Sequence, residues 1–480
     1  MSPPGAPLRE GDEITLDIAD LAFGGRGVAR VSGFVVFVKG ALPGESARVR
    51  VARVKASYAE GDCLQVLRPS RDRVTPPCRH YGECGGCDLQ HLSPPAQAEA
   101  KRRQVIAMLC RLGGLDEPPV QGALTAGEPT MYRFRMDFDW GTGPDGRPAL
   151  GLHRYGHPAE ILTIENCLLM PEMANEIRAF IGRRAETLRL QPWDAKRRRG
   201  LLRRIGIRMA RSTDEILAIL ETGRGDPPAL LELARDLRRV FPRIVGVVRR
   251  EFDRHDRPSG ESILHGRDHL FERVEGDLLK VPAWTFFQPN AAAAGVLRAA
   301  VIEALVPGRE ESILELYCGV GLFTLPLARA ARQVVAVDVS REAVSAARDN
   351  AASAGLPNAR FMCRDVVQAL PGLLQELPWD SVLLDPPRTG LPPAAIQAIA
   401  GADVRRVVYV SCDPATMARD LRLMLLGGGM SLRSVRPLDL FPQTHHVECV
   451  ARLEREPVSG RRAGAGPERP GPSTHRTIPG

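Results

Sequence analysis

The spacing of apolar and polar residues changes twice along the 480-residue chain and divides it into three regions. In residues 8–68, short apolar stretches follow one another with only turn sequences between them; examples are ITLDI (14–18), GFVVFVKG (33–40) and RVRVARV (48–54). Strands this short without intervening helices predict a small OB-like barrel, a scaffold that often binds nucleic acid. A barrel of this kind without a ligand is the alternative.

Residues 69–280 have a mixed pattern. The segment 96–112 (AQAEAKRRQVIAMLCRL) has helical spacing with one basic face, and YRFRMDFDW (132–140) alternates so that its aromatic residues share one face of a strand. A turn sequence then leads to ALGLHRY (149–155), which predicts a hairpin in an antiparallel sheet. The basic run 196–199, followed by Arg203 and Arg204, predicts either phosphate contacts or a solvated face, and the pattern does not separate the two.

From residue 281 to residue 456, apolar strands alternate with helix-length segments. The strands are SILELY (312–317), QVVAVDV (333–339), ARFMCRD (359–365), WDSVLLD (379–385) and VRRVVYVS (404–411). This alternation predicts a doubly wound parallel sheet, whose ligands bind beyond the carboxyl ends of the strands. The last two stretches, 431–441 and 445–454, have no helix between them and predict an antiparallel hairpin at the edge of the sheet.

A glycine turn follows the first of these strands. The sequence ELYCGVG (315–321) places Gly319 and Gly321 where the backbone can approach a ligand, and Asp338 ends the next strand, where it can accept from ribose hydroxyls. The third glycine of the dinucleotide fingerprint is missing, so the pattern favours an adenosyl ligand without a pyrophosphate. Asp365, after the third strand, is placed either to meet the adenine or to cap a helix.

Three further reactive groups are expected at the same rim. LLDPPRTG (383–390) puts Asp385 at the tip of the fourth strand, either facing a planar base or within an ordinary rigid loop. VYVSCDPAT (408–416) breaks at Cys412, which by pattern alone is a small core residue, a metal ligand or a nucleophile. Glu448 lies on the final hairpin. Because the carboxyl ends of neighbouring parallel strands share one edge, these groups are expected to converge.

A second cysteine feature stands in the glycine-rich loop PPCRHYGECGGCDLQH. Cys78, Cys84 and Cys87 have the spacing C-x5-C-x2-C, and three thiols this close in a reducing compartment predict a metal centre. Cys167 is the candidate fourth ligand. Zinc fits four thiolates, but its sites usually pair two C-x2-C motifs, so an iron–sulfur cluster is favoured. A structural cluster is favoured over a redox catalyst, because the other reactive groups are expected in a different domain.

Composition narrows the partner and the compartment. The chain has 65 basic and 57 acidic residues, and a net charge of +8 favours a polyanionic partner that meets local basic patches. No apolar run is long enough to span a membrane and the N-terminus lacks a signal sequence, so we expect a cytoplasmic protein that does not enter membranes. Residues 457–480 hold four arginines and one glutamate among many glycines and prolines, which predicts a disordered basic tail.

These residues carry a family resemblance. The chain resembles the S-adenosylmethionine-dependent RNA 5-methyluridine methyltransferases, particularly the bacterial 23S ribosomal RNA members that carry a TRAM domain and a 4Fe–4S cluster. The resemblance runs from residue 8 to about residue 455 and rests on six motifs in family order: CRHYGECGGC, FFQPN (286–290), ELYCGVGLFTLPLA, LLDPPRTG, VSCDPAT and FPQTHHVE. It implies an α/β and β multidomain protein with an OB-like TRAM barrel over 8–68, a central domain with the Fe–S site over 69–280, and a Rossmann-like class I methyltransferase domain over 281–456.

The resemblance also implies roles for single residues. Positions that hold the 4Fe–4S cluster in the family are matched by Cys78, Cys84, Cys87 and Cys167. Positions that contact S-adenosylmethionine are matched by Gln288, Tyr317, Asp338, Asp365 and Asp385. Cys412 matches the nucleophile and Glu448 the base. Leu322 stands where relatives often have a polar residue that touches the cofactor, so that hydrogen bond is expected to be missing, and Asp413 replaces a common asparagine.

The expected reaction explains why these groups are needed. C5 of uracil is a poor nucleophile, but a thiolate from Cys412 that adds at C6 turns C5 into an enolate carbon able to attack a methyl sulfonium. A carboxylate must then remove the C5 proton, which is the role expected of Glu448. The target uracil must also leave its stack, and Phe286 is a candidate stacking partner, with a core position as the alternative.

Other functions fit the sequence less well. A radical S-adenosylmethionine methylthiotransferase has C-x3-C-x2-C spacing, which this chain lacks, and methylation of an adenine amino group normally uses an aromatic residue where Arg388 stands. Methylation at C5 of cytosine and a non-catalytic Fe–S RNA-binding protein remain alternatives. The expected substrate is 23S ribosomal RNA rather than transfer RNA. No obligate protein partner is evident, which favours a monomer.

Overall fold

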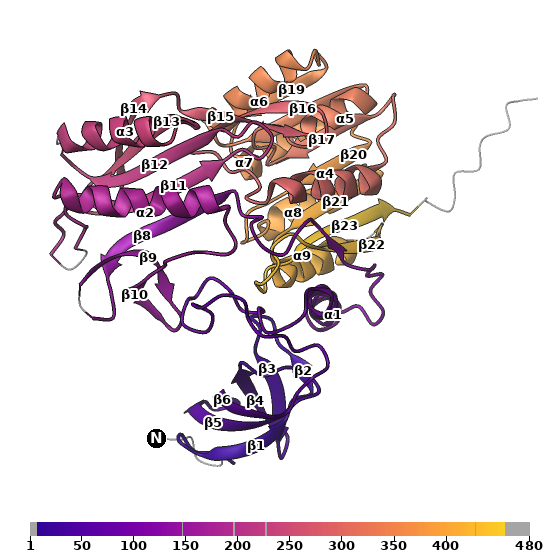
Figure 1. Ribbon diagram of the computed structural model, residues 1–480. Coiled ribbons are helices and arrows are strands. Elements are labelled where there is room, and N and C mark those ends of the chain that lie inside the picture. The colour runs from indigo at the N-terminus through magenta and orange to yellow at the C-terminus, as the bar shows by residue number, and fades with distance from the viewer. Residues whose placement is uncertain (1–6, 146, 195–196, 226–227, 428, 457–480) are drawn as a thin grey trace, which may run out of the picture.

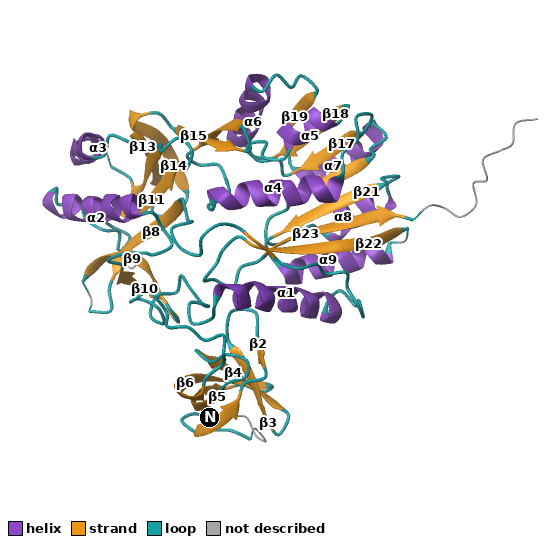
Figure 2. Cartoon of the chain, turned by 45° about the vertical axis from the view of Figure 1, so that its right-hand side comes forward, coloured by secondary structure: helices purple, strands orange, loops and turns teal. Residues whose placement is uncertain are grey.

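The computed structural model describes residues 7–145, 147–194, 197–225, 228–427 and 429–456 (Figure 1). The basic tail expected over 457–480 and Lys196 of the basic run lie outside these residues. Three sheets dominate the fold, and helices cover the second and third of them (Figure 2). No helix within the described ranges is long and apolar enough to cross a membrane.

The N-terminal region folds as a six-stranded sheet that stands apart from the rest in Figure 1. Its strands are β1 (Glu13–Asp17), β2 (Asp20–Leu21), β3 (Gly27–Val31), β4 (Phe34–Lys39), β5 (Ser46–Val54) and β6 (Tyr58–Arg68). They lie in the order β1-β5-β6-β4-β3-β2. Alternate residues of β4 and β5, such as Val36 and Val49, are fully buried in the core on one face of the sheet, because successive side chains of a strand point to opposite faces. The expected run of short strands without a helix is confirmed.

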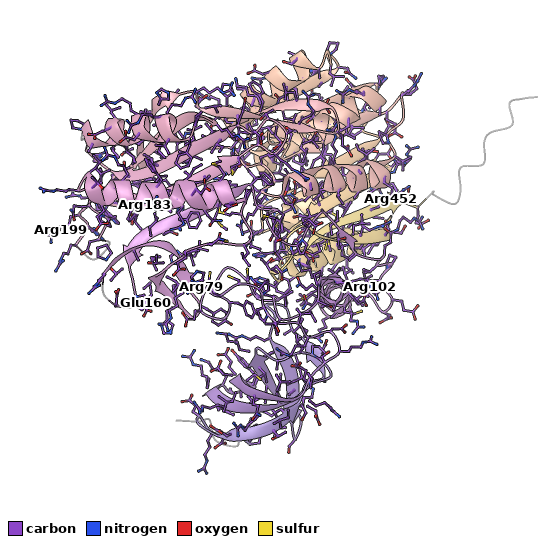
Figure 3. All side chains as sticks on the ribbon, viewed as in Figure 1. Arg79, Arg102, Glu160, Arg183, Arg199 and Arg452 are labelled. Atoms are coloured by element: carbon purple, nitrogen blue, oxygen red, sulfur yellow. The ribbon has the colours of Figure 1, made fainter. Side chains whose placement is uncertain are left out.

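The central region is a seven-stranded sheet with two helices on one face (Figures 1 and 2). Its elements are β8 (Arg135–Thr142), β9 (Pro148–Arg154), β10 (His157–Thr163), α2 (Glu172–Thr187), β11 (Leu202–Met209), β12 (Ile216–Gly223), α3 (Pro228–Val240), β13 (Ile244–Phe252) and β14 (Pro258–Gly266). The strand order is β10-β9-β8-β11-β12-β13-β14, and only β12 and β13, which α3 connects, are parallel. Figure 3 shows Arg183 on α2 and Arg199 at the end of this sheet farthest from the C-terminal sheet.

The hairpin expected from residues 132–155 is confirmed, but its first strand begins three residues late. Met131 has a left-handed backbone with φ of 51°, and the Tyr132 hydroxyl donates to the Pro442 carbonyl at 2.8 Å. Tyr132 is therefore anchored to the C-terminal domain instead of joining the strand, while Met136 and Phe138 are buried against α2 as the alternation predicts.

The C-terminal region is the expected doubly wound sheet. Its strands are β17 (Ser312–Leu316), β18 (Gln333–Asp338), β19 (Ala359–Cys363), β20 (Ser381–Leu384), β21 (Arg406–Ser411), β22 (Met430–Asp439) and β23 (Glu448–Arg455). Its helices are α4 (Ala291–Leu305), α5 (Thr324–Ala330), α6 (Arg341–Ser353), α7 (Val366–Glu376), α8 (Pro393–Gly401) and α9 (Pro414–Leu426). Strands β17 to β21 are parallel, and β23 lies antiparallel between β21 and β22. Every residue of β17, β20 and β21 is buried, as continuous apolar strands predict.

Segments from before residue 281 also belong to the C-terminal sheet and its core. The final hairpin does not form the edge of the sheet as expected, because β7 (Leu124–Thr125) pairs in parallel with β22. Helix α1 (Pro94–Arg111) packs Val105 and Leu109 into the same core as Leu421. The Lys101 ammonium contacts the Asp439 carboxylate at 2.5 Å with both side chains buried. A hairpin of β15 (His269–Val274) and β16 (Asp277–Pro282) lies between the central and C-terminal sheets.

Candidate active site

The glycine turn after β17 is held by a carboxylate from the next strand. Gly319 and Gly321 have φ of 54° and 90°, in the left-handed region that favours glycine. The Gly319 amide donates to the Asp338 carboxylate at 2.9 Å, and the Ser340 amide donates to its other oxygen at 2.8 Å. Asp338 thus joins the ends of β17 and β18 and leaves the turn open at the carboxyl edge of the sheet.

Tyr317, Asp365 and Leu322 surround this turn in different ways. Tyr317 is half-buried, and burial together with the carboxylates of Asp365 and Asp338 raises the pKa of its phenol to about 12. Asp365 accepts from the Gln368 amide at 2.9 Å, so it caps α7, and its side chain is exposed. Leu322 is buried in the apolar core with α4, where a polar side chain would lose its hydration.

The FFQPN segment lies where the methyltransferase domain meets the central sheet. Gln288 is buried and lines a small cavity at the junction with Arg208, whose guanidinium donates to the Pro282 and Thr285 carbonyls at 2.5 Å each. Asn290, which the sequence patterns did not single out, caps α4 through the Ala293 amide at 3.1 Å and donates to the Leu440 carbonyl at 2.9 Å. Phe286 is 68% exposed, which excludes the alternative that it belongs to the core.

Cys412 and Glu448 are placed side by side by strand pairing. Ser411 of β21 pairs with Cys449 of β23, so the next residues along the two antiparallel strands are Cys412 and Glu448. Asp413 accepts from the Thr416 amide at 2.8 Å and starts α9 immediately after the cysteine. Strand β21 therefore ends at Ser411, directly before Cys412, as the Asp-Pro break predicts.

The charges and burial of the groups around Cys412 shift one another's pKa values. Burial raises the pKa of Cys412 to about 11; the Glu448 carboxyl adds to the rise, and the positive charge of the Arg388 guanidinium opposes it. Burial and the Asp338 charge raise the pKa of Asp385 to about 7. Burial and Asp385 raise the pKa of Glu448 well above its ordinary value. Two buried carboxyl groups that repel each other retain a proton in neutral solution more readily than isolated ones.

Arg388 is a candidate functional residue that the sequence patterns did not identify. In the sequence it stands out only as a residue that does not fit adenine amino methylation, yet it follows Asp385 by three positions on the exposed loop after β20. It influences the pKa values of Cys412, Glu448 and His446. The signal available in the sequence is a cation within a loop that presents a carboxylate at the rim of the sheet.

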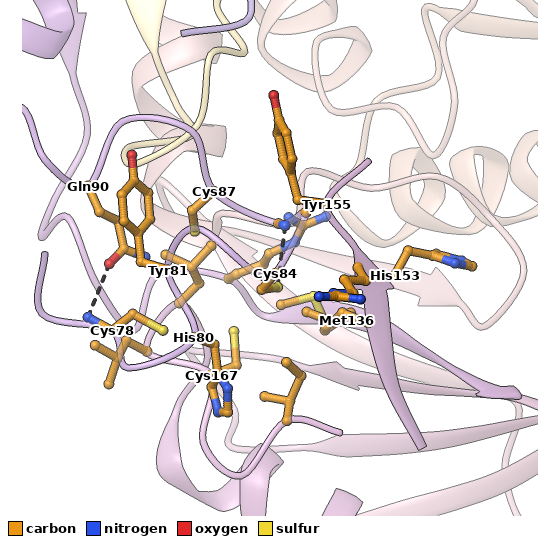
Figure 4. A pocket seen from close by; sticks show the side chains of 18 of the residues that line it. Cys78, His80, Tyr81, Cys84, Cys87, Gln90, Met136, His153, Tyr155 and Cys167 are labelled. Carbon is orange, nitrogen blue, oxygen red and sulfur yellow. Dashed lines mark hydrogen bonds between the residues drawn. The ribbon is translucent and has the colours of Figure 1, made fainter. Parts of the chain in front are cut away.

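The four predicted cluster cysteines line one cavity. Cys78, Cys84, Cys87 and Cys167 surround a space of about 440 Å³, together with Arg133 and Arg154 (Figure 4). Burial raises the pKa of Cys84 to about 11 and of Cys87 to about 12, and neighbouring thiols add to both rises. Within the described ranges, no three His, Cys, Asp or Glu side chains form a group recognisable as a metal-ion site. Four thiols and two cations around a space larger than one ion nevertheless suit an anionic cluster of several metals.

The cysteine loop contacts the segment that leads into Glu448. The Asp88 and Leu89 amides, directly after Cys87, both donate to the Gln443 carbonyl at 2.9 Å. The Asp88 carboxylate also lies 2.6 Å from Nδ1 of His445. The loop therefore contacts the segment that leads into Glu448, although the two are far apart in the sequence.

Comparison with known proteins agrees with this geometry. The family model described as tRNA (uracil-5-)-methyltransferase matches residues 267–456, and the TRAM domain model matches residues 7–64. A protein of Gloeobacter violaceus named as an uncharacterized RNA methyltransferase is 37% identical over 459 residues, which cover 94% of this chain and 98% of the relative. A similarly named protein of Halalkalibacterium halodurans is 32% identical, with 95% and 99% of the two chains covered.

The chain belongs to the RNA (uracil-5-)-methyltransferase family. It is an S-adenosylmethionine-dependent RNA methyltransferase with an N-terminal TRAM domain. The crystal structure of Pyrococcus abyssi tRNA (uracil-54, C5)-methyltransferase in complex with S-adenosyl-L-homocysteine has a similar fold, with a TM-score of 0.69 and 25% identity. The match covers 92% of this chain and all of that chain, so the two proteins have a similar fold over nearly their whole lengths.

Proposed function

We propose that this methyltransferase acts on C5 of a specific uridine in 23S ribosomal RNA through a covalent adduct between Cys412 and C6. The observation that carries the proposal is the convergence of a thiol, two carboxyl groups and a guanidinium at the ends of β20, β21 and β23. A cysteine that only fills space in a core does not require charged neighbours. A nucleophile that adds to a base and later leaves it requires a cation that favours the thiolate and a base that accepts a proton.

The chain's own residues supply the proton and electron movements. The Cys412 thiolate adds to C6 and leaves the uracil as an enolate, which C5 uses to take the methyl group from the sulfonium of S-adenosylmethionine. Glu448 then accepts the proton from C5, and the electron pair of that C–H bond expels the thiolate from C6. Arg388 favours the thiolate both when it attacks and when it leaves. Without a base at position 448 the adduct would persist.

We propose a set of residues that bind S-adenosylmethionine because most of them lie along the carboxyl edge of the C-terminal sheet. Gly319, Gly321 and Asp338 form the open turn after β17, Tyr317 and Asp365 lie next to it, and Asp385 follows β20 on the same rim. Gln288 would approach from the FFQPN segment, and exposed Phe286 is free to stack on a uracil that has left its helix. Asp338→Asn should weaken binding of S-adenosyl-L-homocysteine in calorimetry more than Asp365→Asn, because Asp338 also holds the glycine turn.

We further propose that Cys78, Cys84, Cys87 and Cys167 hold a 4Fe–4S cluster. The shared cavity and its two arginines support this proposal. Protein purified without oxygen should contain about four irons and four sulfides per chain. Cys84→Ser should lose most of both, whereas Cys63→Ser, a partly buried thiol in the N-terminal sheet, should retain them. Metal content that is equal in the two variants would contradict the proposal.

The choice of RNA rests on the TRAM domain and the cysteine set, which the resemblance associates with 23S ribosomal RNA. The structural neighbour is named for transfer RNA, so a transfer RNA uridine is the second candidate. Mapping 5-methyluridine in ribosomal and transfer RNA from a deletion strain distinguishes the two, and an unchanged ribosomal pattern would refute the first choice. Release of tritium from C5-labelled uridine in RNA, dependent on S-adenosylmethionine, tests catalysis itself.

A further inference from the structure

A second concave site lies at the far end of the central sheet. Three loops form a cleft of about 570 Å³: Trp193 and residues 198–200 before β11, the turn after β12 at Arg224, and residues 252–257 between β13 and β14. Its basic lining residues are Arg198, Arg199, Arg224, Arg254, His255 and Arg257. Asp253 is the acidic residue that lines it. Arg199 marks its position at the edge of the molecule in Figure 3.

The floor of the cleft is built from fixed contacts. The Arg203 guanidinium lies 3.8 Å from the centre of the Trp193 ring and donates to the Asp253 carbonyl at 2.9 Å, so it ties the first loop to the third. Trp193 is half-buried, and the guanidinium of Arg203 lies over its ring. Gly200 has φ of 111°, and a Cβ there would lie 2.1 Å from the Pro192 carbonyl oxygen, so only glycine allows the loop to fold back with Arg199 facing outward.

A buried arginine fixes the second loop. Arg249 is 2% exposed, and its guanidinium donates to the Thr222 hydroxyl at 2.8 Å and to the Gly223 carbonyl at 3.3 Å. It also donates to the Gly225 carbonyl. These bonds hold the backbone on both sides of Arg224, whose side chain is exposed. The cleft is therefore a preformed surface, which reduces the entropy lost when a ligand binds.

The cleft differs from the rest of the central sheet in its charge balance. On the sheet itself, Arg204 contacts Asp139 at 2.8 Å and Arg250 contacts Glu261 at 2.5 Å. In the part of the chain that the structure describes, Arg198, Arg199 and Arg224 form no ion pair and no side-chain hydrogen bond. Within the cleft, Arg257 contacts the Asp253 carboxylate at 2.8 Å, so the basic lining residues outnumber their counter-charges. Like charges that outnumber their counter-charges repel one another, and a polyanion removes that cost.

We propose that this cleft binds the phosphate backbone of the substrate RNA at a distance from the modified uridine. The inference rests on the proposed function, because the ligand is the same RNA that Cys412 attacks. Strand β11 runs from Leu202 beside the cleft to Met209, next to the Arg208 contacts with the FFQPN segment. Eight residues of strand span roughly 24 Å, a distance that a folded RNA covers and a single flipped nucleotide does not. Guanidinium groups suit phosphate because their planar fork of N–H donors can donate to two phosphate oxygens at once.

The test compares Arg199→Ala/Arg224→Ala with the control Arg183→Ala/Arg235→Ala. Both pairs remove two exposed arginines from the central domain, and the control residues lie on α2 and α3 outside the cleft. Binding of an unmodified 23S ribosomal RNA transcript is measured over a range of KCl concentrations. Because each lost phosphate contact lowers the salt slope by roughly 0.7–0.9, the cleft pair should lose about 1.5 and bind about tenfold more weakly or worse. The control pair should follow the wild type.

Kinetics separate this inference from the proposed function. The KM for the full transcript should rise more in the cleft pair than the KM for a short hairpin that contains the modified uridine, because the hairpin does not reach the cleft. Equal binding by the cleft and control pairs, or equal KM changes for transcript and hairpin, would overturn the inference. A wild-type enzyme that methylates no RNA would refute the proposed function instead, while the binding comparison would still decide the role of the cleft.

Discussion

The reactivity of Cys412 should respond in opposite directions to its two charged neighbours. Arg388 lowers the pKa of the thiol and Glu448 raises it, against the larger effect of burial. We therefore expect Arg388→Met to make the thiol less reactive toward iodoacetamide and Glu448→Gln to make it more reactive. Arg388→Lys should lie between Arg388→Met and the wild type, because it keeps the charge but not the planar guanidinium.

The magnitude follows from the charges. Two unit charges about 4 Å apart interact by roughly 4 kcal/mol at an effective dielectric of 20 and by about 1 kcal/mol in water. Arg388 is exposed, so a value near 1.4 kcal/mol, or about one pKa unit, is reasonable. Below the pKa of about 11, one unit changes the thiolate fraction about tenfold. The more basic thiolate is intrinsically about threefold more nucleophilic, which leaves a net change of about threefold in each direction.

The assay follows carboxamidomethylation of the Cys412 peptide by mass spectrometry near pH 9. The exposed thiol of Cys363 in the same sample is the internal control, since it lies on β19 away from both substitutions. The rates of the two variants should differ by about tenfold for Cys412 and should agree for Cys363. Changes of the same sign for both variants would refute the account of the thiol's electrostatics.

Three further predictions concern the stability of the fold, its dependence on pH, and the proposed stacking of Phe286 on the target uracil. Lys101→Met should cost about 3–5 kcal/mol of unfolding free energy in urea, because it leaves Asp439 buried and unpaired, and Lys101→Met/Asp439→Leu should recover most of it; no recovery would contradict the pairing argument. Burial raises the pKa of Glu315 to about 8, so the folded state keeps a proton that the unfolded state releases, and wild-type stability should fall as pH rises from about 4.5 to 8. Glu315→Gln should lose up to about 5 kcal/mol of that pH dependence, and parallel stability curves would refute it. Phe286→Ala should raise the KM for RNA by about fivefold or more with little change in Tm, whereas Phe286→Trp should not; equal KM values would remove the stacking role.

The parts of the fold set by local pattern could be predicted from the sequence. Buried parallel strands such as Arg406–Ser411 are nearly continuous apolar runs, so their positions along the chain can be recognised from the amino acids alone. The break at Cys412 is equally recognisable, because Asp413 and the proline after it start a helix. Where a local pattern decides the conformation, prediction and structure agree.

Contacts between distant segments could not be predicted in this way. The spacing in α1 indicates a buried face but not its partner, and only the folded chain brings Lys101 to Asp439 across 338 positions. The same holds for β7 on the edge of the sheet and for Asp88 beside His445. Arg388 belongs to this class, since its importance comes from the groups that three different strand ends bring around it.

The most direct test of the account is the isolation of the covalent intermediate. Glu448→Gln protein is incubated with unmodified transcript and S-adenosylmethionine, denatured and digested, and the products are analysed by mass spectrometry. The account predicts a peptide containing Cys412 that carries a methylated uridine nucleotide, and its absence from Cys412→Ala/Glu448→Gln. An adduct on another residue, or rapid release of 5-methyluridine by Glu448→Gln with no adduct, would contradict it.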